Sequence, residues 1–504
     1  MPLSVPQSPA AFLPARSRQC MLSCLLWLAT AMPASAAPFA YFSDTGKNNF
    51  TVVDMANFNT VSATSLGANR SMPTDTVVNQ ATRKIFIGEK SGVLIIDATT
   101  NSIMGEVLIG ASDPAAPSNT TGVIALAVSP DGQRVFALSK GGSITVIDPI
   151  KKTITGNITV DPSSRKMTLS RDGETLYVSS TGFGDSLSTV LGVAGVTVID
   201  ALDNSIERVV SIGKYFPTQL AVHPTDGRIF IIGRHLYPST EYGYLVIDPD
   251  KYSVRNVELV PTNVQKPGLA SLAFNENGSR VYMSGSGAFT RAPLLEIDTT
   301  TGAVLRSLST GNLIGDNNTA LKLTSSFANG KFDLVAFLTG ASTRLPYFAS
   351  TKVVFIDVQN GTVLKELQYS QELNRTDYTI AGDVLDPPAD ATPQTTSTIL
   401  QGSANPPLRR TIPLRFYATV TGNNPTGKVV FKFVSQSAKG KQVEKVRVPL
   451  TGNMATLALP ACDGRWGDRA LSKIICGASF SAVAIYRGDA NNARSRSTVI
   501  DETY

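Results

Sequence analysis

Hydrophobic residues recur along most of the chain in short runs that end in an aspartate. Seven such runs read FTVVD, VLIID, ITVID, VTVID, YLVID, LLEID and VVFID. They end at Asp54, Asp97, Asp148, Asp200, Asp248, Asp298 and Asp357, so that successive aspartates lie 43 to 59 residues apart. This period is too long for one hairpin and predicts a repeated unit of four strands.

Other segments of the repeat complete this unit. Segments such as ALAVSPDGQRVFALS and SLAFNENGSRVYMSG predict two strands around a tight turn, with Asp-Gly or Asn-Gly reversing the chain. Each unit is then an inner strand, a second strand, the strand ending in aspartate and an outer strand. Seven units around one axis would bury the apolar faces that a single sheet leaves in water. Helical periodicity is not sustained after residue 37, so the prediction is an all-β fold.

The two ends of the repeat region predict how the ring closes. The segment AYFSD resembles the second strand of a unit, and 50–54 and 60–66 resemble the third and fourth, so the first unit lacks an inner strand. Segment 377–385 (DYTIAGDVL) follows the seventh repeat. We expect it to pair with the N-terminal strands, which would remove free sheet edges.

The repeated aspartates have two readings. They could form a ring of catalytic carboxylates or calcium ligands. A residue that recurs at one place in every unit is better explained by turn capping, in which the carboxylate accepts backbone N–H bonds. His223 stands where other units have Ser129 and Ser170, and it needs no separate explanation.

The repeat resembles the YVTN family of bacterial β-propellers, within the superfamily that includes lactonases and quinoprotein amine dehydrogenases. Tyr177-Val178, Val198-Ile199-Asp200 and the run from Ser129 to Gly132 (SPDG) carry the match. The resemblance covers roughly residues 38–390. It implies a seven-bladed β-propeller over 38–386, and its motif is specific to a fold rather than to a chemistry.

A second module follows the repeats. The run DPPADATPQ predicts a linker over 387–394, and six or seven short strands follow within 395–504. This is the size of an immunoglobulin-like sandwich. The module resembles bacterial Ig-like repeat domains at 405–406 (NP), 417–420 (YATV), 425–427 (PTG) and 486–490 (YRGDA).

The N-terminus predicts export. Arg16 and Arg18 precede the apolar run 21–32, and Ala34-Ser35-Ala36 follows, as in a signal peptide over 1–36 that is cleaved after Ala36. A membrane anchor is the alternative, but the run is shorter than the ~20 residues that span a bilayer. We expect a periplasmic, secreted or cell-surface protein with no transmembrane segment after cleavage.

Few residues of the mature chain suit a metal or a cofactor. Cys462 and Cys476 are its two cysteines, and an oxidising compartment predicts that they form a disulfide, which distinguishes this module from other Ig-like repeats. The close cysteine and histidine spacing of zinc sites is absent, as is a haem attachment motif. With only His223 and His235, the sequence predicts no metal and no cofactor.

Charge is distributed unevenly between the modules. Residues 393–504 contain 15 Lys or Arg and 6 Asp or Glu, a net charge of +9, whereas 38–392 carries 28 and 33, a net charge of −5. The basic module could dock on an anionic cell-envelope polymer or simply be a solvated surface. A nucleic acid partner is not expected, because no set of aromatic residues alternates with the basic ones.

Four connections between second and third strands are long, namely 181–195, 233–244, 286–293 and 340–351. In a ring they would emerge on one rim, where aromatic and guanidinium groups suit a carbohydrate, a peptide or an anionic ligand. Ordinary variable loops are the alternative. The predicted ligand-binding residues are Arg234, His235, Tyr237, Tyr242, Phe289, Arg291, Arg344, Tyr347 and Phe348.

Three functions fit these features. The first is an exported, non-enzymatic binding or scaffold protein that uses the loop rim, with the second module as a spacer or anchor. The second is an enzyme of the propeller lactonase or quinoprotein dehydrogenase type, supported by fold analogy alone because no catalytic residues can be identified. The third is a cell-surface adhesin. Partners would be a protein, a peptide or a cell-envelope polysaccharide.

Overall fold

The computed structural model describes residues 39–44, 49–66, 74–109, 122–182, 194–213, 215–235, 243–259, 268–286, 294–308, 317–324, 335–344, 348–373, 380–385, 396–402, 413–437, 440–462, 469–477, 479–486 and 495–503. Over these residues the fold is all-β, with one short helix. The strands before residue 386 form seven antiparallel sheets of four strands each. Two further sheets follow in the C-terminal part.

The seven sheets follow one another along the chain. The first consists of β28 (Ile380–Leu385), β1 (Phe39–Asp44), β2 (Asn49–Asp54) and β3 (Asn59–Ser65). The second consists of β4 (Asp75–Asn79), β5 (Lys84–Gly88), β6 (Gly92–Asp97) and β7 (Ser102–Leu108). The third consists of β8 (Val123–Val128), β9 (Val135–Ser139), β10 (Ser143–Asp148) and β11 (Thr153–Thr159). The fourth consists of β12 (Ser164–Leu169), β13 (Thr175–Ser180), β14 (Gly195–Asp200) and β15 (Ser205–Ser211).

The last three sheets repeat the pattern. The fifth consists of β16 (Tyr215–Val222), β17 (Ile229–His235), β18 (Gly243–Ile247) and β19 (Val254–Glu258). The sixth consists of β20 (Gly268–Phe274), β21 (Arg280–Ser286), β22 (Leu294–Asp298) and β23 (Val304–Leu308). The seventh consists of β24 (Asn317–Thr324), β25 (Val335–Arg344), β26 (Phe348–Asp357) and β27 (Thr362–Leu373).

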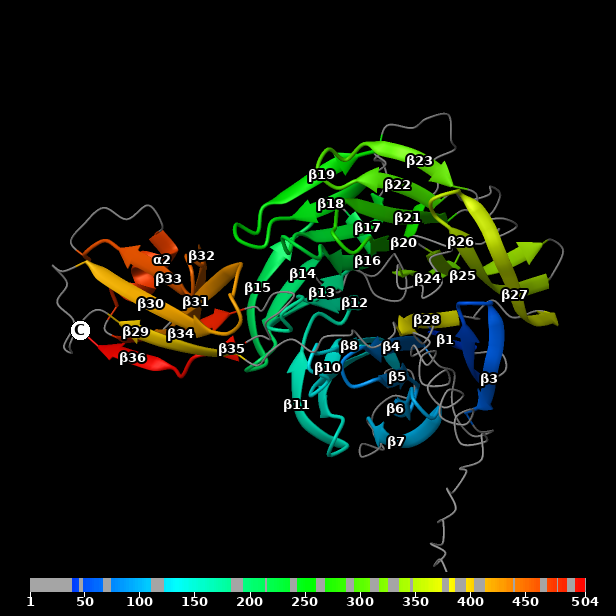
Figure 1. Cartoon of the computed structure of the whole chain (residues 1–504), viewed down its shortest axis with the longest axis horizontal. Coiled ribbons are helices and arrows are strands. Elements are labelled where there is room, and N and C mark those ends of the chain that lie inside the picture. The colour runs from blue at the N-terminus through cyan, green and yellow to red at the C-terminus, as the bar shows by residue number, and fades with distance from the viewer. Residues whose placement is uncertain are drawn as a thin grey trace, which may run out of the picture.

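The first strands of these sheets form a closed cycle of contacts. Strands β4, β8, β12, β16, β20, β24 and β28 each contact the next, and β28 contacts β4 again. Figure 1 shows the sheets arranged around a common centre. The part of the chain before residue 386 is therefore a propeller-like ring.

The ring is closed by strands from both ends of the repeat region. Strand β28 pairs with β1 in antiparallel register, from Phe39 opposite Leu385 to Asp44 opposite Ile380. The predicted pairing of the segment after the seventh repeat with the N-terminal strands is confirmed for 380–385, and residues 377–379 lie outside the described part. The first sheet thus gains its inner strand from the far end of the repeats.

Apolar side chains from neighbouring sheets pack together between them. One cluster joins Phe136 and Leu138 of β9 to Leu176 and Val178 of β13, all fully buried. Burying one such side chain contributes roughly 1.5–3 kcal/mol. The core of the ring is thus divided into layers between adjacent sheets, as the repeated apolar runs predict.

The C-terminal part is a two-sheet unit, here called the sandwich. One sheet has β29 (Ser397–Gly402), β30 (Leu414–Thr421) and β33 (Met454–Leu459). The other has β32 (Gly440–Pro449), β31 (Lys428–Ser437), β34 (Ser479–Tyr486) and β35 (Ser495–Arg496), with β36 (Ile500–Thr503) also paired to β34. Phe416, Phe431, Phe433 and Phe480 are buried between the two sheets.

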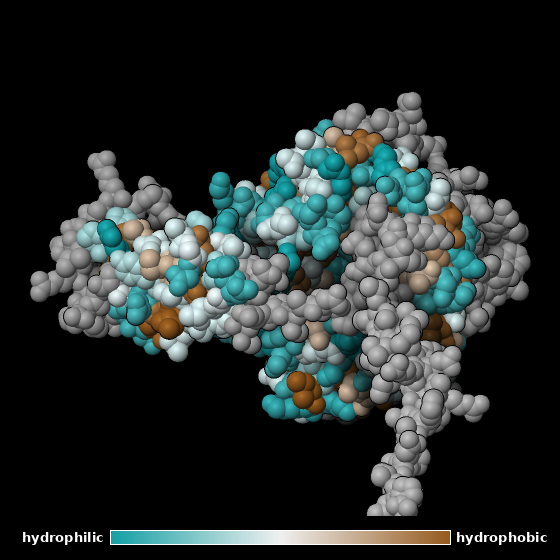
Figure 2. Space-filling model, viewed as in Figure 1, coloured by the Kyte–Doolittle hydropathy of each residue, from teal (hydrophilic) through white to brown (hydrophobic). Residues whose placement is uncertain are grey.

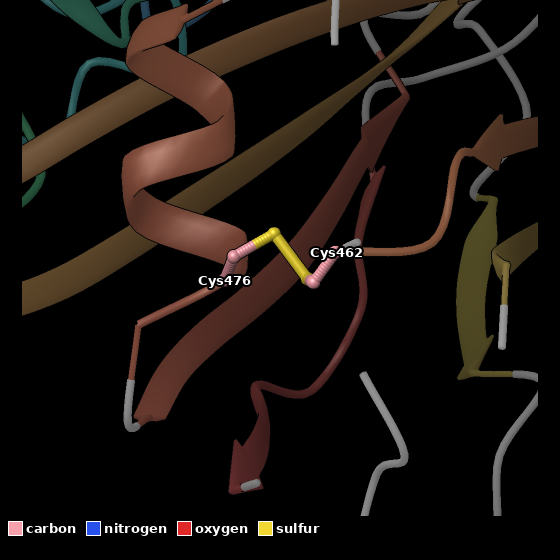
Figure 3. The surroundings of a disulfide bond; sticks show 2 residues. All are labelled: Cys462 and Cys476. Atoms are coloured by element: carbon pink, nitrogen blue, oxygen red, sulfur yellow. A yellow bond between two sulfur atoms is a disulfide. The ribbon is translucent and has the colours of Figure 1, made fainter. Parts of the chain in front are cut away.

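A disulfide and a short helix form the excursion between β33 and β34. Cys462 and Cys476 are bonded, with their Cα atoms 5.5 Å apart (Figure 3). The helix α2 (Arg469–Ile475) precedes Cys476 and buries Leu471, Ile474 and Ile475 in the sandwich core. The disulfide was predicted, whereas the expectation of strands alone misses this helix.

Candidate functional site

The ring has two faces with different kinds of connection. Because neighbouring strands are antiparallel, the turns from first to second strand and from third to fourth strand lie at one end of each sheet. We call this end the turn face. The connections from second to third strand and the links between units lie at the other end, the loop face.

Neighbouring sheets point the same way around the ring. Near the start of β4, the Thr74 hydroxyl donates to the carbonyl of Val123, and the Asp75 carboxylate accepts the N–H of Leu126, 2.8 Å away. At the other end of the strand, Asn79 Nδ2 donates to the carbonyl of Ser129 at 2.9 Å. The starts of β4 and β8 therefore lie side by side, and so do their ends. Each face is continuous between these two units.

The repeat aspartates hold the turns of the turn face. In all seven, one carboxylate oxygen accepts the backbone N–H of the residue two positions later, at 2.7–3.0 Å. Accepted N–H bonds hold the pKa of Asp97, Asp148 and Asp298 below its usual range, with Thr99, Lys151 and Thr301 as the main donors. This is the capping geometry that the repeat predicts, and it uses carboxylates that a catalytic ring would need free.

His223 joins two neighbouring sheets near the turn face. Its Nε2 lies 2.8 Å from the carbonyl oxygen of Gly278, and its ring packs against Phe230 and Phe274. Gly278 has φ = +73°, and a Cβ there would lie 2.6 Å from the imidazole. Since the imidazole is 4% exposed, this geometry supports a packing role rather than a ligand-binding role.

Four of the nine residues predicted to bind a ligand lie in the described part of the loop face. Arg234 and His235 end β17, where their backbones pair with Phe216 and Tyr215. Tyr237, Tyr242, Phe289, Arg291 and Tyr347 lie outside the described residues. The structure therefore places the backbones of Arg234, His235, Arg344 and Phe348 at this face, and the predicted arc of side chains stays a prediction.

Within the described residues, the ladder between the second and third strands is longest in the seventh sheet, which projects at the loop face. The β13–β14 ladder has six pairs, from Thr175 opposite Asp200 to Ser180 opposite Gly195. The β25–β26 ladder also begins at its repeat aspartate, Asp357, but has ten pairs and ends with Arg344 opposite Phe348. Four further pairs extend a ladder by about 13 Å.

This ladder corrects one predicted loop. Residues 340–351 were expected to be a long connection, but only 345–347 lie between the two strands. Thr and Phe in this segment favour extended pairing, whereas its Ser, Gly and Pro are typical of a loop. Figure 1 shows the long strands β26 and β27 on the side of the ring away from the sandwich.

The sandwich contacts the ring at the turn face. Lys445 Nζ lies 3.0 Å from a carboxylate oxygen of Glu207 and 3.3 Å from the Thr175 hydroxyl, near the start of β13. Arg447 pairs with Asp250, two residues beyond the repeat aspartate Asp248. These contacts lie at the end of the sheets opposite to the projecting ladder.

Neither a metal-binding cluster nor a membrane-spanning helix occurs among the described residues. Within the ranges given above, His, Cys, Asp and Glu do not gather in groups of three or more that could hold a metal ion. In the same part of the chain, no helix has the length and apolar character needed to cross a bilayer.

Comparison with known proteins adds little to this picture. No family model matches the chain, and neither does any curated protein. Among solved structures, a chain of Kuenenia stuttgartiensis hydrazine synthase is similar over 59% of this chain and 79% of its own length, with 18% identity and a TM-score of 0.44. This likeness is too weak to carry an argument about function.

Proposed function

We propose that the protein is an exported binding or scaffold protein without enzymatic activity. In this proposal residues 1–36 are removed on export, and the mature protein acts in the periplasm, outside the cell or at its surface. The ring is a seven-bladed β-propeller that binds a ligand at its loop face. Residues 395–504 are an immunoglobulin-like domain that acts as a spacer or anchor.

The projecting ladder of the seventh sheet is the observation that carries this proposal. It adds a wall of regular backbone beside the loop face, and rigid strands position binding groups better than free loops do. Its tip brings Arg344 and Phe348 to directly opposed positions. The turn face, by contrast, is occupied by capped turns and by the sandwich.

The residue types favour a carbohydrate or an anionic glycan as ligand. Aromatic faces stack on the apolar faces of sugars, and guanidinium groups donate paired hydrogen bonds to carboxylates and sulfates. The predicted loop residues supply both groups in adjacent units. The proposed partner is therefore a cell-envelope polysaccharide, in preference to a small metabolite.

Shortening the projecting ladder tests this proposal. Replacing 342–350 with Asn-Gly would close the hairpin after the Ala341–Thr351 pair with a two-residue turn. We expect binding to a glycan array and to immobilised envelope polysaccharide to fall at least tenfold, with unchanged circular dichroism. The point variants Arg344→Ala and Phe348→Ala should each weaken binding by a smaller factor.

A turn-face variant provides the control. Lys151 is an exposed residue of a capped turn on the turn face, so Lys151→Ala should bind as the wild type does. Unchanged binding by the shortened hairpin would remove the loop face as the site. Turnover of lactones or amines by the purified protein would instead favour an enzyme.

A further inference from the structure

The sandwich concentrates three cations on one patch of its outer face. Lys432 of β31 lies directly opposite Lys445 of β32, and Arg447 of β32 lies two residues further on. Like charges in directly opposed positions destabilise a strand pair. Lys432, Lys445 and Arg447, here called the cation patch, therefore need negative groups from outside their own sheet.

The ring supplies one carboxylate for each of these cations. Lys432 pairs with Asp200, Lys445 with Glu207 and Arg447 with Asp250. The three carboxylates come from the end of β14, from β15 and from the turn after β18. In a fourth ion pair the ring supplies the cation and the sandwich the anion: Arg208 lies 3.8 Å from Glu444. The contact is thus a set of matched charges.

Part of the sheet face that carries the cation patch is apolar, because Val430, Val483 and Ile485 on that face are only 0–4% exposed. Each buried apolar cluster belongs entirely to the ring or entirely to the sandwich. Figure 2 shows the outer surface of the described residues, on which hydrophilic residues are common and hydrophobic residues form small separate patches. Relative movement of the two units would therefore have to break the ion pairs and expose this apolar face.

Burial makes these charges depend on one another. The side chains of Lys432 and Asp200 are 5% and 2% exposed, so neither charge is well hydrated. At Lys445, burial opposes the charged form, but Glu207, Tyr252 and Glu174 together outweigh it and raise the pKa. Lys445 is therefore kept charged by its anionic neighbours, and Lys432 is paired with Asp200 where water has little access.

We propose that the cation patch is a binding site for a linear polyanion and that the ring's own carboxylates occupy it as an internal competitor. In the closed state Asp200, Glu207 and Asp250 stand in for the anionic groups of the ligand. A polyanion releases the sandwich from the turn face by taking their place. This proposal concerns a different surface from the loop face and does not depend on the function proposed there.

Removing two of the ring carboxylates in the full chain tests this proposal. The variant Glu207→Gln/Asp250→Asn keeps Asp200, which also caps a turn. Its matched control, Glu258→Gln/Glu276→Gln, changes the net charge equally at exposed sites outside these ion pairs. Binding of labelled dextran sulfate, with neutral dextran as reference, and the radius of gyration from small-angle scattering would be measured for each.

We expect Glu207→Gln/Asp250→Asn to bind dextran sulfate about tenfold more tightly than the wild type and to have a larger radius of gyration. Adding Lys445→Gln/Arg447→Gln should abolish that gain, whereas adding Lys473→Gln/Arg496→Gln at exposed sites should leave most of it. Asp250→Asn alone alters a half-exposed side chain, so it keeps the test valid if the double variant fails to fold. Binding equal to that of the matched control, or a gain that survives the loss of Lys445 and Arg447, would overturn the proposal.

Discussion

At the scale of single residues, the repeat aspartates show why one side chain recurs in every unit. Asp357 is 3% exposed, and its carboxylate accepts the backbone N–H groups of Gln359 and Asn360 at 3.0 and 3.2 Å. The same carboxylate accepts Asn360 Nδ2 at 2.7 Å. Because backbone N–H groups supply most of these hydrogen bonds, a turn held in this way tolerates different residues at most positions between its strands.

Asp357→Ala should therefore destabilise the ring. It leaves two backbone donors without this acceptor, and we expect the free energy of unfolding to fall by about 1–3 kcal/mol. Urea unfolding followed by circular dichroism measures the change. Gln359→Ala, at the exposed neighbour in the same turn, should change the free energy by less than about 0.5 kcal/mol. Equal effects of the two substitutions would mean that the carboxylate does not hold the turn.

Buried tyrosines predict a loss of stability at alkaline pH. Burial raises the pKa of Tyr41 to about 12, and its hydroxyl donates to the Ala98 carbonyl at 3.3 Å, joining the first two sheets. The unfolded chain releases this proton near pH 10, so folded Tyr41 binds it more tightly between pH 10 and 12. The stability it contributes is complete below pH 10 and is lost as the pH rises toward 12.

The measurement is the urea midpoint of the wild type and of Tyr41→Phe at pH 9, 10, 11 and 12. The wild type should lose stability over this range, and Tyr41→Phe should lose about 1–2 kcal/mol less. Burial also raises the pKa of Tyr244 and of Tyr282 to about 12. Because these two residues remain in Tyr41→Phe, the variant should still lose some stability at alkaline pH. Parallel curves for the two proteins would show that Tyr41 does not titrate differently on folding.

At the scale of elements, apolar runs that recur in every unit predicted most strands, whereas a short helical pattern that occurs only once was missed. The run ending at Asp200 and the segment 380–385 were recognisable because their places in the repeat were known. Helix α2 was not, because Leu471, Ile474 and Ile475 give the i, i+3, i+4 pattern only once. In the projecting ladder, Ser and Gly residues concealed the strand ends.

Helix α2 contributes to the sandwich core. Substituting one of its buried residues should therefore lower the free energy of unfolding strongly, whereas substituting an exposed neighbour should hardly change it. Ile474 is 1% exposed in that core, so Ile474→Ala should lower the free energy of unfolding by about 2–4 kcal/mol. The adjacent Lys473 faces solvent, and Lys473→Ala should change it by less than about 0.5 kcal/mol. Thermal unfolding of the oxidised protein measures both, and a small effect of Ile474→Ala would mean that the helix does not pack as described.

At the scale of the whole molecule, the structure explains part of the opposite net charges of ring and sandwich, which the sequence alone could not explain. The basic module could be related only to outside partners or to solvent, because nothing along the chain indicates which strand of one module faces which sheet of the other. The ion pairs assign part of that charge to the contact between modules. The predicted loop residues could be grouped on one face by the repeat, but their mutual geometry depends on long connections that no repeat specifies.

The two proposed binding surfaces lie on opposite faces of the ring and should behave independently. The projecting ladder ends at the loop face, whereas the cation patch and its carboxylates meet at the turn face, and the ion pairs there involve no residue of the ladder. Effects at separate sites without common partners add to within about 0.5 kcal/mol, roughly a factor of two in affinity. The hairpin shortened over 342–350 should therefore bind dextran sulfate within twofold of the wild type. Combined with Glu207→Gln/Asp250→Asn, it should keep the full gain in affinity, and a loss of that gain would show that the two faces are coupled through the ring.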